Sequence, residues 1–250
     1  MREGLVSVII PAYNCERFIS ETIESVIAQT YPDWEMVIID DKSTDRTEEI
    51  IESYARKDGR IRFYRNESNI GAAETRNKGM ELAEGEFMAF LDSDDLWAPK
   101  KLEKQIDFMR KNDHAFTCTS YEHISEEGEK TGRVFSPRQK ANYRQVVLYN
   151  SVGNLTVVYN VKKLGKFTAP NVFAREDYGL WLSILKKEDY IWGLPEVLAY
   201  YRIRKASCSR NKFRMVKYQW ILLHDVERLG FFRSCLNILY TGLLKVLFIK

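Results

Sequence analysis

The sequence has 250 residues, 45% hydrophobic and 29% charged, which are the proportions of an ordinary soluble globular chain. Its four cysteines and three histidines lack the close spacing of a disulfide framework or a zinc site, which argues against both classes. The net charge of +3 hides an asymmetry, because residues 200–250 carry eleven Lys or Arg and two Asp or Glu. A basic end on an acidic body favours contact with phosphate or an anionic membrane.

The chain enters an apolar run almost at once, without the charged region or cleavage site of a signal peptide. Its longest apolar runs are shorter than the roughly 18 residues expected of a spanning helix. We therefore expect a cytoplasmic protein, and the basic end leaves open a peripheral position at the inner face of the cytoplasmic membrane.

The first ninety residues alternate two kinds of pattern. Strand-like apolar runs lie at residues 6–10, 36–39, 61–64 and 87–91, and helical spacing lies at residues 18–27, 45–54 and 71–82. Strands that alternate with helices predict βαβ units. The fold class is therefore α/β, with a Rossmann-like, mostly parallel sheet flanked by helices.

Polar residues follow three of these strands. Tyr13 and Asn14 follow the first, Asp40 and Asp41 end the second, and residues 92–95 follow the fourth. Parallel sheets bind ligands at the carboxyl ends of their strands. The pattern therefore gathers five carboxylates near one edge of the sheet.

Beyond Pro99 the chain continues with mixed elements. Helices are expected at residues 99–112, 137–149 and 180–185, and strands at residues 115–124 and 155–159. No internal repeat or clean domain boundary occurs before about residue 204. We assign residues 1–210 to one domain and residues 211–250 to a helical extension.

The extension has its own pattern. Residues 213–226 show helical spacing, and after Gly230 the residues Arg233, Asn237, Thr241 and Lys245 recur at four-residue intervals. They form a narrow polar stripe on an otherwise apolar helix. Such a helix needs lipid, a partner or a groove, and the alternative is a helix packed back on the body.

Three acids within four residues, Asp92, Asp94 and Asp95, directly follow a buried strand. Clustered carboxylates repel one another unless they share a cation. Solvated charges on a surface loop are the alternative. The position at a strand end favours oxygen ligands for Mg²⁺ or Mn²⁺ bridging a diphosphate.

Other polar residues leave two interpretations open. Asp40 and Asp41 either cap a helix or accept hydrogen bonds from a nucleobase or ribose. Arg76 either pairs with phosphate or forms an internal ion pair with a neighbouring aspartate. Glu176 and Asp177 open an apolar helix, where acids are favourable on dipole grounds alone.

Several segments in a fixed order together resemble family 2 glycosyltransferases of the GT-A fold. The resemblance covers roughly residues 4–210 and is carried by residues 8–14, 38–45, 69–79, 85–95, 175–182, 200–202 and 207–209. An ordered set of motifs is far more specific than any one of them.

The resemblance implies a role for each matching residue. Asp41 would bind the base, usually uracil in this family, and Asp177 would be the general base. Asp94 would ligate the metal, and Asp92 would contact both ribose and metal. The rest of the nucleotide-sugar site would comprise Pro11, Tyr13, Asn14, Arg76 and Ser93.

The implied activity is metal-dependent, inverting transfer of a single sugar from a nucleotide-diphosphate sugar, a UDP-hexose or UDP-N-acetylhexosamine, to a hydroxyl. The expected acceptor is a glycan or lipid-linked glycan of surface polysaccharide, such as lipopolysaccharide or capsule. The Gln-x-x-Arg-Trp signature of processive synthases is absent, so we expect one sugar per binding event.

Two residues depart from the family pattern. Lys42 stands where the family often has glycine, which would alter the turn or place an ammonium near the nucleotide. Arg204 stands where many relatives have a histidine near the metal, and an arginine would hold diphosphate instead.

The alternatives are a non-catalytic sugar-nucleotide-binding scaffold on the same fold and a nucleotidyltransferase. The latter needs a glycine-rich loop after the first strand, where this chain has Pro11 to Cys15. The basic end carries no nucleic-acid-reading motif, so we expect no nucleic-acid partner.

Overall fold

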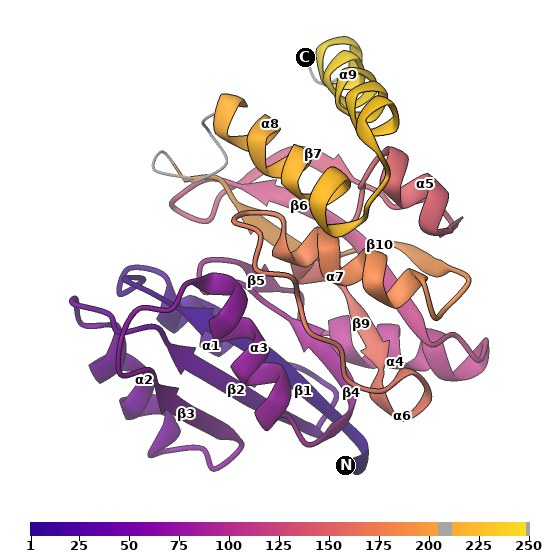
Figure 1. Ribbon diagram of the computed structural model, residues 1–250. Coiled ribbons are helices and arrows are strands. Elements are labelled where there is room, and N and C mark those ends of the chain that lie inside the picture. The colour runs from indigo at the N-terminus through magenta and orange to yellow at the C-terminus, as the bar shows by residue number, and fades with distance from the viewer. Residues whose placement is uncertain (205–211, 249–250) are drawn as a thin grey trace.

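The computed structural model describes residues 1–204 and 212–248 (Figure 1). The expected domain boundary at residues 210 and 211, and the segment 207–209 of the family resemblance, lie outside these residues.

The N-terminal half alternates strands and helices as its sequence predicts. Its elements are β1 (Arg2–Ala12), α1 (Ile19–Ile27), β2 (Trp34–Asp40), α2 (Thr47–Ala55), β3 (Ile61–Arg65), α3 (Ala72–Leu82) and β4 (Gly85–Phe90). These strands lie side by side in the order β3-β2-β1-β4, and every pairing is parallel. The Rossmann-like character of this half is confirmed.

The middle of the chain extends the same sheet. Its elements are β5 (Leu96–Trp97), α4 (Lys101–Lys111), β6 (Phe116–Ile124), β7 (Lys130–Phe135), β8 (Lys140–Ala141), α5 (Tyr143–Leu148), a 3₁₀ turn (Asn154–Thr156), β9 (Val158–Asn160), α6 (Val161–Leu164), α7 (Glu176–Leu185) and β10 (Ile191–Arg202).

The sheet becomes mixed in this half. Its order is β3-β2-β1-β4-β9-β6-β10-β5, and β9 runs antiparallel to both β4 and β6. Strands β6 and β7 form a hairpin, and β10 pairs with β6 in parallel. The uniformly parallel arrangement thus ends at β4, and β9 is inserted antiparallel between β4 and β6.

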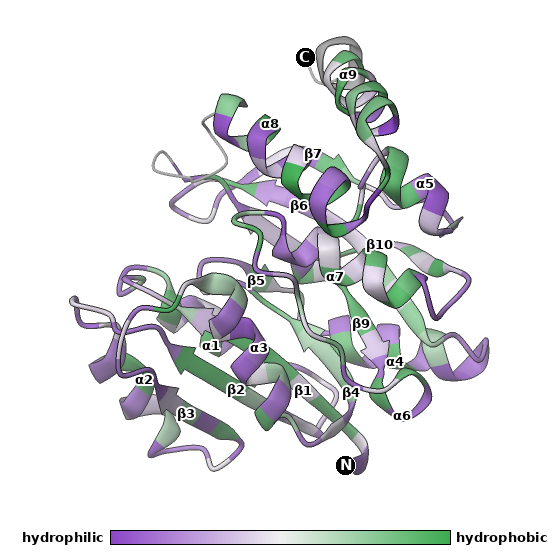
Figure 2. Cartoon of the chain, viewed as in Figure 1, coloured by the Kyte–Doolittle hydropathy of each residue, from purple (hydrophilic) through white to green (hydrophobic). Residues whose placement is uncertain are grey.

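Side chains of successive strand residues point to opposite faces of the sheet. In β1, Val8 and Ile10 belong to the apolar cluster covered by α1, α2 and α4, whereas Ile9 belongs to the cluster covered by α3 and α7. Residues of β2 alternate in the same way. This period of two explains why the buried strands are almost continuously apolar (Figure 2).

Lys101 of α4 is one of several charged residues that the structure buries. Lys101 is fully buried, with its ammonium 4.1 Å from the ring centre of Trp97 and 2.9 Å from the Gln105 side-chain oxygen. Burial lowers the pKa of Lys101 to about 7.

The C-terminal extension is helical, as expected. It comprises α8 (Lys212–Trp220), a π-helical segment (Ile221–Val226) and α9 (Phe231–Phe248). Leu222 and Leu223 are completely buried in the main core, so the beginning of the extension packs on the body. In the parts of the chain that the structure describes, no helix is long and apolar enough to cross a bilayer.

Candidate active site

The acidic loop, residues 92–95, follows β4 and is held in place by the end of β10. Arg202 is buried there, and its backbone N–H donates to Asp95 Oδ1 at 2.9 Å. The Nε of Arg202 donates to the Asp94 carbonyl oxygen at 2.8 Å. On the other side, the Thr22 hydroxyl of α1 donates to the Asp95 carbonyl at 3.0 Å. The loop is therefore fixed by distant parts of the chain.

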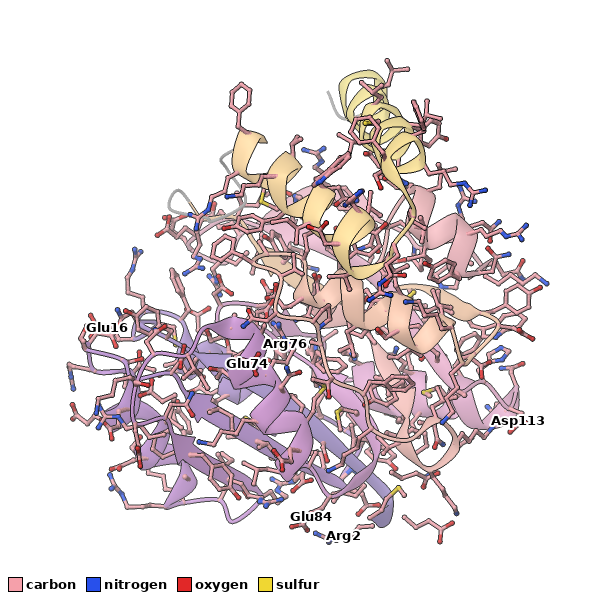
Figure 3. The ribbon with its side chains drawn as sticks, viewed as in Figure 1. Arg2, Glu16, Glu74, Arg76, Glu84 and Asp113 are labelled. Carbon is pink, nitrogen blue, oxygen red and sulfur yellow. The ribbon has the colours of Figure 1, made fainter. Side chains whose placement is uncertain are left out.

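Arg76 of α3 connects this loop to α7. Its Nη2 donates to Asp92 Oδ1 at 2.9 Å, and its Nη1 donates to Glu176 Oε1 at 3.0 Å. Asn154 donates to the same Asp92 oxygen at 2.9 Å. Figure 3 shows Arg76 near the centre of the molecule, between the N-terminal strands and α7. Of the two interpretations of Arg76, the internal ion pair is the arrangement observed.

The charge of Arg76 is secured by its neighbours. Burial alone would lower the pKa of Arg76, but the charges of Asp92 and Glu176 outweigh burial and raise it. The guanidinium thus remains a permanent cation among carboxylates.

Asp177 lies beside Glu176 in the first turn of α7. Its pKa is raised to about 6, mainly by burial and then by the negative charge of Glu176. The Arg76 charge and a hydrogen bond from the Tyr178 N–H oppose that shift. A carboxyl group with a pKa near neutrality is suited to accept a proton during catalysis.

Asp94 pairs with Arg204, which is one of the two residues that depart from the family pattern. Arg204 Nε lies 2.6 Å from Asp94 Oδ2. Burial raises the pKa of Asp94, the Arg204 charge lowers it, and the nearby Asp92 charge raises it further. The pKa of Asp95 is raised well above its usual value by burial and by both other aspartates. Negative charge is therefore crowded in this loop.

Asp92 and Asp94 are the residues that would hold a divalent cation in this loop. Among the described residues, no group of three or more His, Cys, Asp or Glu side chains is arranged to hold a metal. Mg²⁺, however, is commonly bound by one or two carboxylates together with substrate phosphates. Asp92 and Asp94 provide such a pair, and added positive charge would offset their repulsion.

Asp40 and Asp41 are buried at the end of β2 and shape the neighbouring turns. Asp41 Oδ1 accepts from Asn66 Nδ2 and from the Ile70 N–H, both at 2.9 Å, and its Oδ2 accepts from the Gly71 N–H at 2.8 Å. A carboxylate has about four acceptor positions, so these three bonds leave one for a ligand. Asp40 accepts from the Ser43 N–H at 3.1 Å, as a turn requires.

The predicted nucleotide-pocket residues at the end of β1 lie against the turn after β2. The Asp41 N–H donates to the Ala12 carbonyl at 2.8 Å, and the Asn14 N–H donates to Ser43 Oγ at 2.9 Å. Pro11 lies in β1 opposite Ile39. The side chain of Tyr13 is half exposed at this edge. The structure thus brings Pro11, Tyr13, Asn14 and Asp41 together.

Lys42 adopts a left-handed backbone with a φ of 65°. Glycine adopts this conformation without strain, which explains the preference for glycine at this position. The turn is kept despite the lysine, and the Lys42 side chain is exposed.

Ser93 lies in the acidic loop near Cys15, which directly follows the predicted site residues Tyr13 and Asn14. Burial raises the pKa of the Cys15 thiol to about 11, and hydrogen bonding to Ser93 opposes that rise. The acidic loop therefore comes close to the end of β1.

Sequence reasoning missed Asn154 and the positioning roles of Glu176 and Arg202. Asn154 lies in a 3₁₀ turn between two loops and belongs to no recognisable motif. Arg202 lies in a segment that resembles the family, yet only its contacts show that it fixes the acidic loop.

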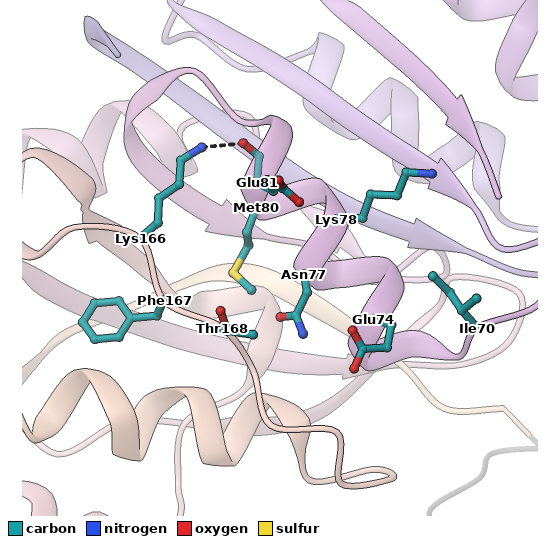
Figure 4. Close-up of a pocket in the computed structure, with 9 residues that line it drawn as sticks. All are labelled: Ile70, Glu74, Asn77, Lys78, Met80, Glu81, Lys166, Phe167 and Thr168. Atoms are coloured by element: carbon teal, nitrogen blue, oxygen red, sulfur yellow. Dashed lines mark hydrogen bonds between the residues drawn. The ribbon is translucent and has the colours of Figure 1, made fainter.

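A groove of about 430 Å³ lies along the outer side of α3 (Figure 4). One side of its lining includes Glu74, Asn77 and Met80 of α3. The other side includes Lys166 and Phe167, which lie in the loop after α6. The Lys166 ammonium donates to the Glu81 carbonyl at 2.6 Å. The groove shares α3 with Arg76 but is not lined by the predicted site residues.

The chain is similar to known proteins in sequence and in fold. Residues 7–171 match the family described as Glycosyl transferase family 2. One relative is TuaG of Bacillus subtilis (strain 168), which carries the name of a teichuronic acid biosynthesis glycosyltransferase. It is 40% identical over 230 residues, which are 92% of this chain and 91% of TuaG. WfgD of Escherichia coli, named UDP-Glc:alpha-D-GlcNAc-diphosphoundecaprenol beta-1,3-glucosyltransferase, is 41% identical over 226 residues, which are 90% of this chain and 87% of WfgD.

Solved structures give the same fold. S. aureus TarS superimposes with a TM-score of 0.71 at 21% identity, over 97% of this chain and 44% of that longer chain. The structure of TarS residues 1–349 in complex with UDP has a TM-score of 0.71 at 21% identity, over 96% of this chain and 71% of the other. Together with the family match and the relatives, this likeness shows that the chain belongs to glycosyltransferase family 2, as an enzyme with the GT-A fold.

Proposed function

We propose that this enzyme transfers one sugar from a UDP-hexose or UDP-N-acetylhexosamine to a hydroxyl of a lipid-linked glycan, with inversion at the anomeric carbon. The observation that carries this proposal is the Arg76 network. It joins Asp92, at the donor side, to the Glu176–Asp177 pair, at the acceptor side, through one partly buried and one buried contact. Donor and acceptor groups are thereby held in one rigid arrangement.

The donor site is proposed at the carboxyl ends of β1, β2 and β4. The remaining acceptor position of Asp41 suits the N–H of a uracil ring, and the exposed Tyr13 and Asn14 border the same space. Pro11 and Ser93 complete the pocket wall. The complex of the similarly folded TarS with UDP supports a uridine nucleotide.

Asp92 and Asp94 are proposed to hold Mn²⁺ or Mg²⁺ together with the donor diphosphate. The ion would neutralise the charge that grows on the leaving diphosphate. Arg204 contributes a second positive charge, because its guanidinium is free to move from Asp94 to a phosphate once Asp94 binds the metal.

Asp177 is proposed as the general base. It accepts the proton of the acceptor hydroxyl while that oxygen attacks the anomeric carbon from the face opposite the diphosphate. The bond between the anomeric carbon and the phosphate oxygen breaks, and UDP leaves with the bonding electron pair. A single displacement of this kind inverts the anomeric centre.

The names of two relatives support the proposed class of acceptor. WfgD is named for an acceptor with a sugar on diphosphoundecaprenol, and TuaG is named for teichuronic acid synthesis. Both names support a glycan of surface polysaccharide, and the former supports a lipid-linked one.

The donor part is tested by thermal unfolding with UDP, GDP, CDP and dTDP, each with and without Mn²⁺. A ligand that binds only the folded state raises its melting temperature. We expect a Mn²⁺-dependent increase with UDP that is lost in Asp94→Ala. The control is Asp107→Ala, which removes an exposed aspartate of α4 that pairs with Lys111. An equal response in Asp94→Ala would contradict the metal site, and a response to another nucleotide alone would contradict uracil.

The transfer itself is tested by release of UDP from UDP-glucose and UDP-N-acetylglucosamine, with N-acetylglucosamine-diphosphoundecaprenol as acceptor. We expect release that requires both acceptor and metal, and a product of inverted anomeric configuration. A retained configuration would overturn the role of Asp177.

A further inference from the structure

Helix α9 turns its polar side toward the protein. Ser234 and Asn237 are 0% and 5% exposed, and Asn237 Nδ2 donates to the Val147 carbonyl of α5 at 2.7 Å. Thr241 lies one turn further along this stripe. A typical surface helix does the opposite, with its apolar side on the core and its polar side in water.

The outward side of α9 is consequently apolar. Phe232, Leu236, Leu239 and Leu243 are 80%, 66%, 68% and 63% exposed. Their spacing of four, three and four residues places them in one stripe along the helix. Figure 2 shows hydrophobic residues along α9, which extends away from the body. Single exposed apolar residues are ordinary, but a contiguous exposed stripe marks a contact with another apolar phase or partner.

The charged residues around this apolar stripe indicate what kind of surface it contacts. Residues 212–250 contain seven Lys or Arg and two Asp or Glu. The buried Glu227 carboxylate pairs with Lys186, and Asp225 contacts His224, so the acids are already engaged. Arg228 and Arg233 are exposed beside the first turns of the stripe.

An apolar stripe flanked by positive charge complements a bilayer with anionic headgroups. A second copy of this chain complements it less well, because a twofold contact through α9 brings the same arginines close to one another.

We propose that α9 lies flat on an anionic membrane surface, with the stripe of Phe232, Leu236, Leu239 and Leu243 among the acyl chains and Arg228 and Arg233 at the headgroups. The elements that precede α9 pack near the start of α7, which carries Glu176 and Asp177. The Tyr218 ring of α8 lies 5.1 Å from that of Phe173, and Leu222 packs against Gly179 of α7. Helices α8 and α9 lie together at the end of the molecule opposite α2 and β3 (Figure 1).

The test is flotation of the full chain with vesicles of phosphatidylcholine alone and of phosphatidylcholine mixed with phosphatidylglycerol. We expect binding to the anionic vesicles, reduced by salt. Leu239→Glu should weaken binding about tenfold or more, since a buried leucine contributes roughly 1.5–3 kcal/mol of transfer free energy. Its control, Ile27→Glu, makes the same charge change at an exposed apolar residue of α1 and should bind as the unmodified chain does.

A second pair of variants tests the contribution of the two arginines to vesicle binding. Arg228→Ser with Arg233→Ser should weaken binding to anionic vesicles about fivefold for each arginine. The control removes Arg46 and Arg56, two exposed arginines that flank α2, and should leave binding unchanged.

Two outcomes overturn the proposal. One is equal flotation of Leu239→Glu and the unmodified chain, or no flotation of either. The other is self-association of the chain without vesicles, lost in Leu239→Glu, which would identify a second copy as the occupant. The assay contains no nucleotide or glycan acceptor, so its result is independent of the proposed transfer reaction.

Discussion

Arg76 and Glu176, which are 100 residues apart in the chain, form an ion pair of 3.0 Å between α3 and the start of α7. Arg76 is 3% and Glu176 9% exposed, so water replaces little of this contact if it is broken. The pair joins the two regions of the site. Its loss should therefore lower the free energy of unfolding, in addition to any effect on catalysis.

The first prediction concerns this buried pair. Arg76→Met leaves the Glu176 carboxylate buried without its partner and should cost about 3–5 kcal/mol of unfolding free energy. Arg76→Met combined with Glu176→Gln should cost clearly less, because the buried charge is removed as well. Urea denaturation of the two variants measures this difference. Arg46→Met, which breaks the exposed pair with Glu49, is the control and should change stability little. Equal losses in the single and double variants would show that charge is not the cause.

The second prediction isolates the proposed general base. Asp177→Asn keeps the size of the side chain but cannot accept a proton, so turnover should fall by about 10²–10⁴-fold. The variant should still bind UDP in the presence of Mn²⁺, as measured by the rise in its melting temperature. Unchanged turnover would assign the base to another group, and lost UDP binding would mean that the substitution disturbs the donor site.

The third prediction is the pH dependence of transfer. Asp177 has a pKa of about 6, raised by burial and by Glu176, and it acts only as the carboxylate. Activity should therefore rise with pH through about 6 and level off above it. The pH profile of kcat/KM for the acceptor measures this limb, since it reports the free enzyme. The residual activity of Asp177→Asn should lack the limb, and its persistence there would contradict the assignment.

The fourth prediction concerns Asn154, which no sequence pattern revealed. Asn154→Ala removes a hydrogen bond to the Asp92 carboxylate and should lower kcat/KM for the donor about tenfold. Arg76 still holds Asp92, so the fold should persist. Asn112→Ala, at the exposed end of α4, is the control for loss of an asparagine. Donor kinetics equal to those of the unmodified enzyme would show that Arg76 alone positions Asp92.

The fifth prediction concerns Lys101 and stability. Its pKa of about 7 in the folded state lies below the ordinary value of 10.5, so between these pH values the unfolded chain binds a proton that the folded chain does not. Stability should therefore rise with pH across this window. Lys101→Met should remove that part of the pH dependence in urea denaturation at pH 7 and pH 10. Parallel pH dependence in both proteins would mean that Lys101 stays protonated.

Much of this arrangement was predictable from local patterns. The alternation of strands and helices predicted the parallel half of the sheet, and the position of Asp92 and Asp94 after a strand predicted that they lie at its edge. The ion pair between Arg204 and Asp94 was not predictable from local patterns, because it depends on how β10, which pairs with β5 and β6, ends beside the acidic loop. The family resemblance alone places Arg204 near the metal. The periodicity of α9 predicted a polar stripe, but periodicity does not tell which side faces the body. The bond from Asn237 to Val147 and the burial of Ser234 determine that orientation.

The late position of Arg202 in the chain has a consequence for the order in which the protein folds during synthesis. The acidic loop at residues 92–95 takes its shape from bonds to a residue more than 100 positions later in the chain. While the ribosome is still synthesising the middle of the protein, the N-terminal half can form its parallel strands and the bond from Thr22 to the loop, but the loop still lacks its bonds from Arg202. Donor binding by a growing chain should therefore begin only after β10 has emerged and paired with β6. A chain truncated before Arg202 should keep much of its core and yet bind no nucleotide sugar.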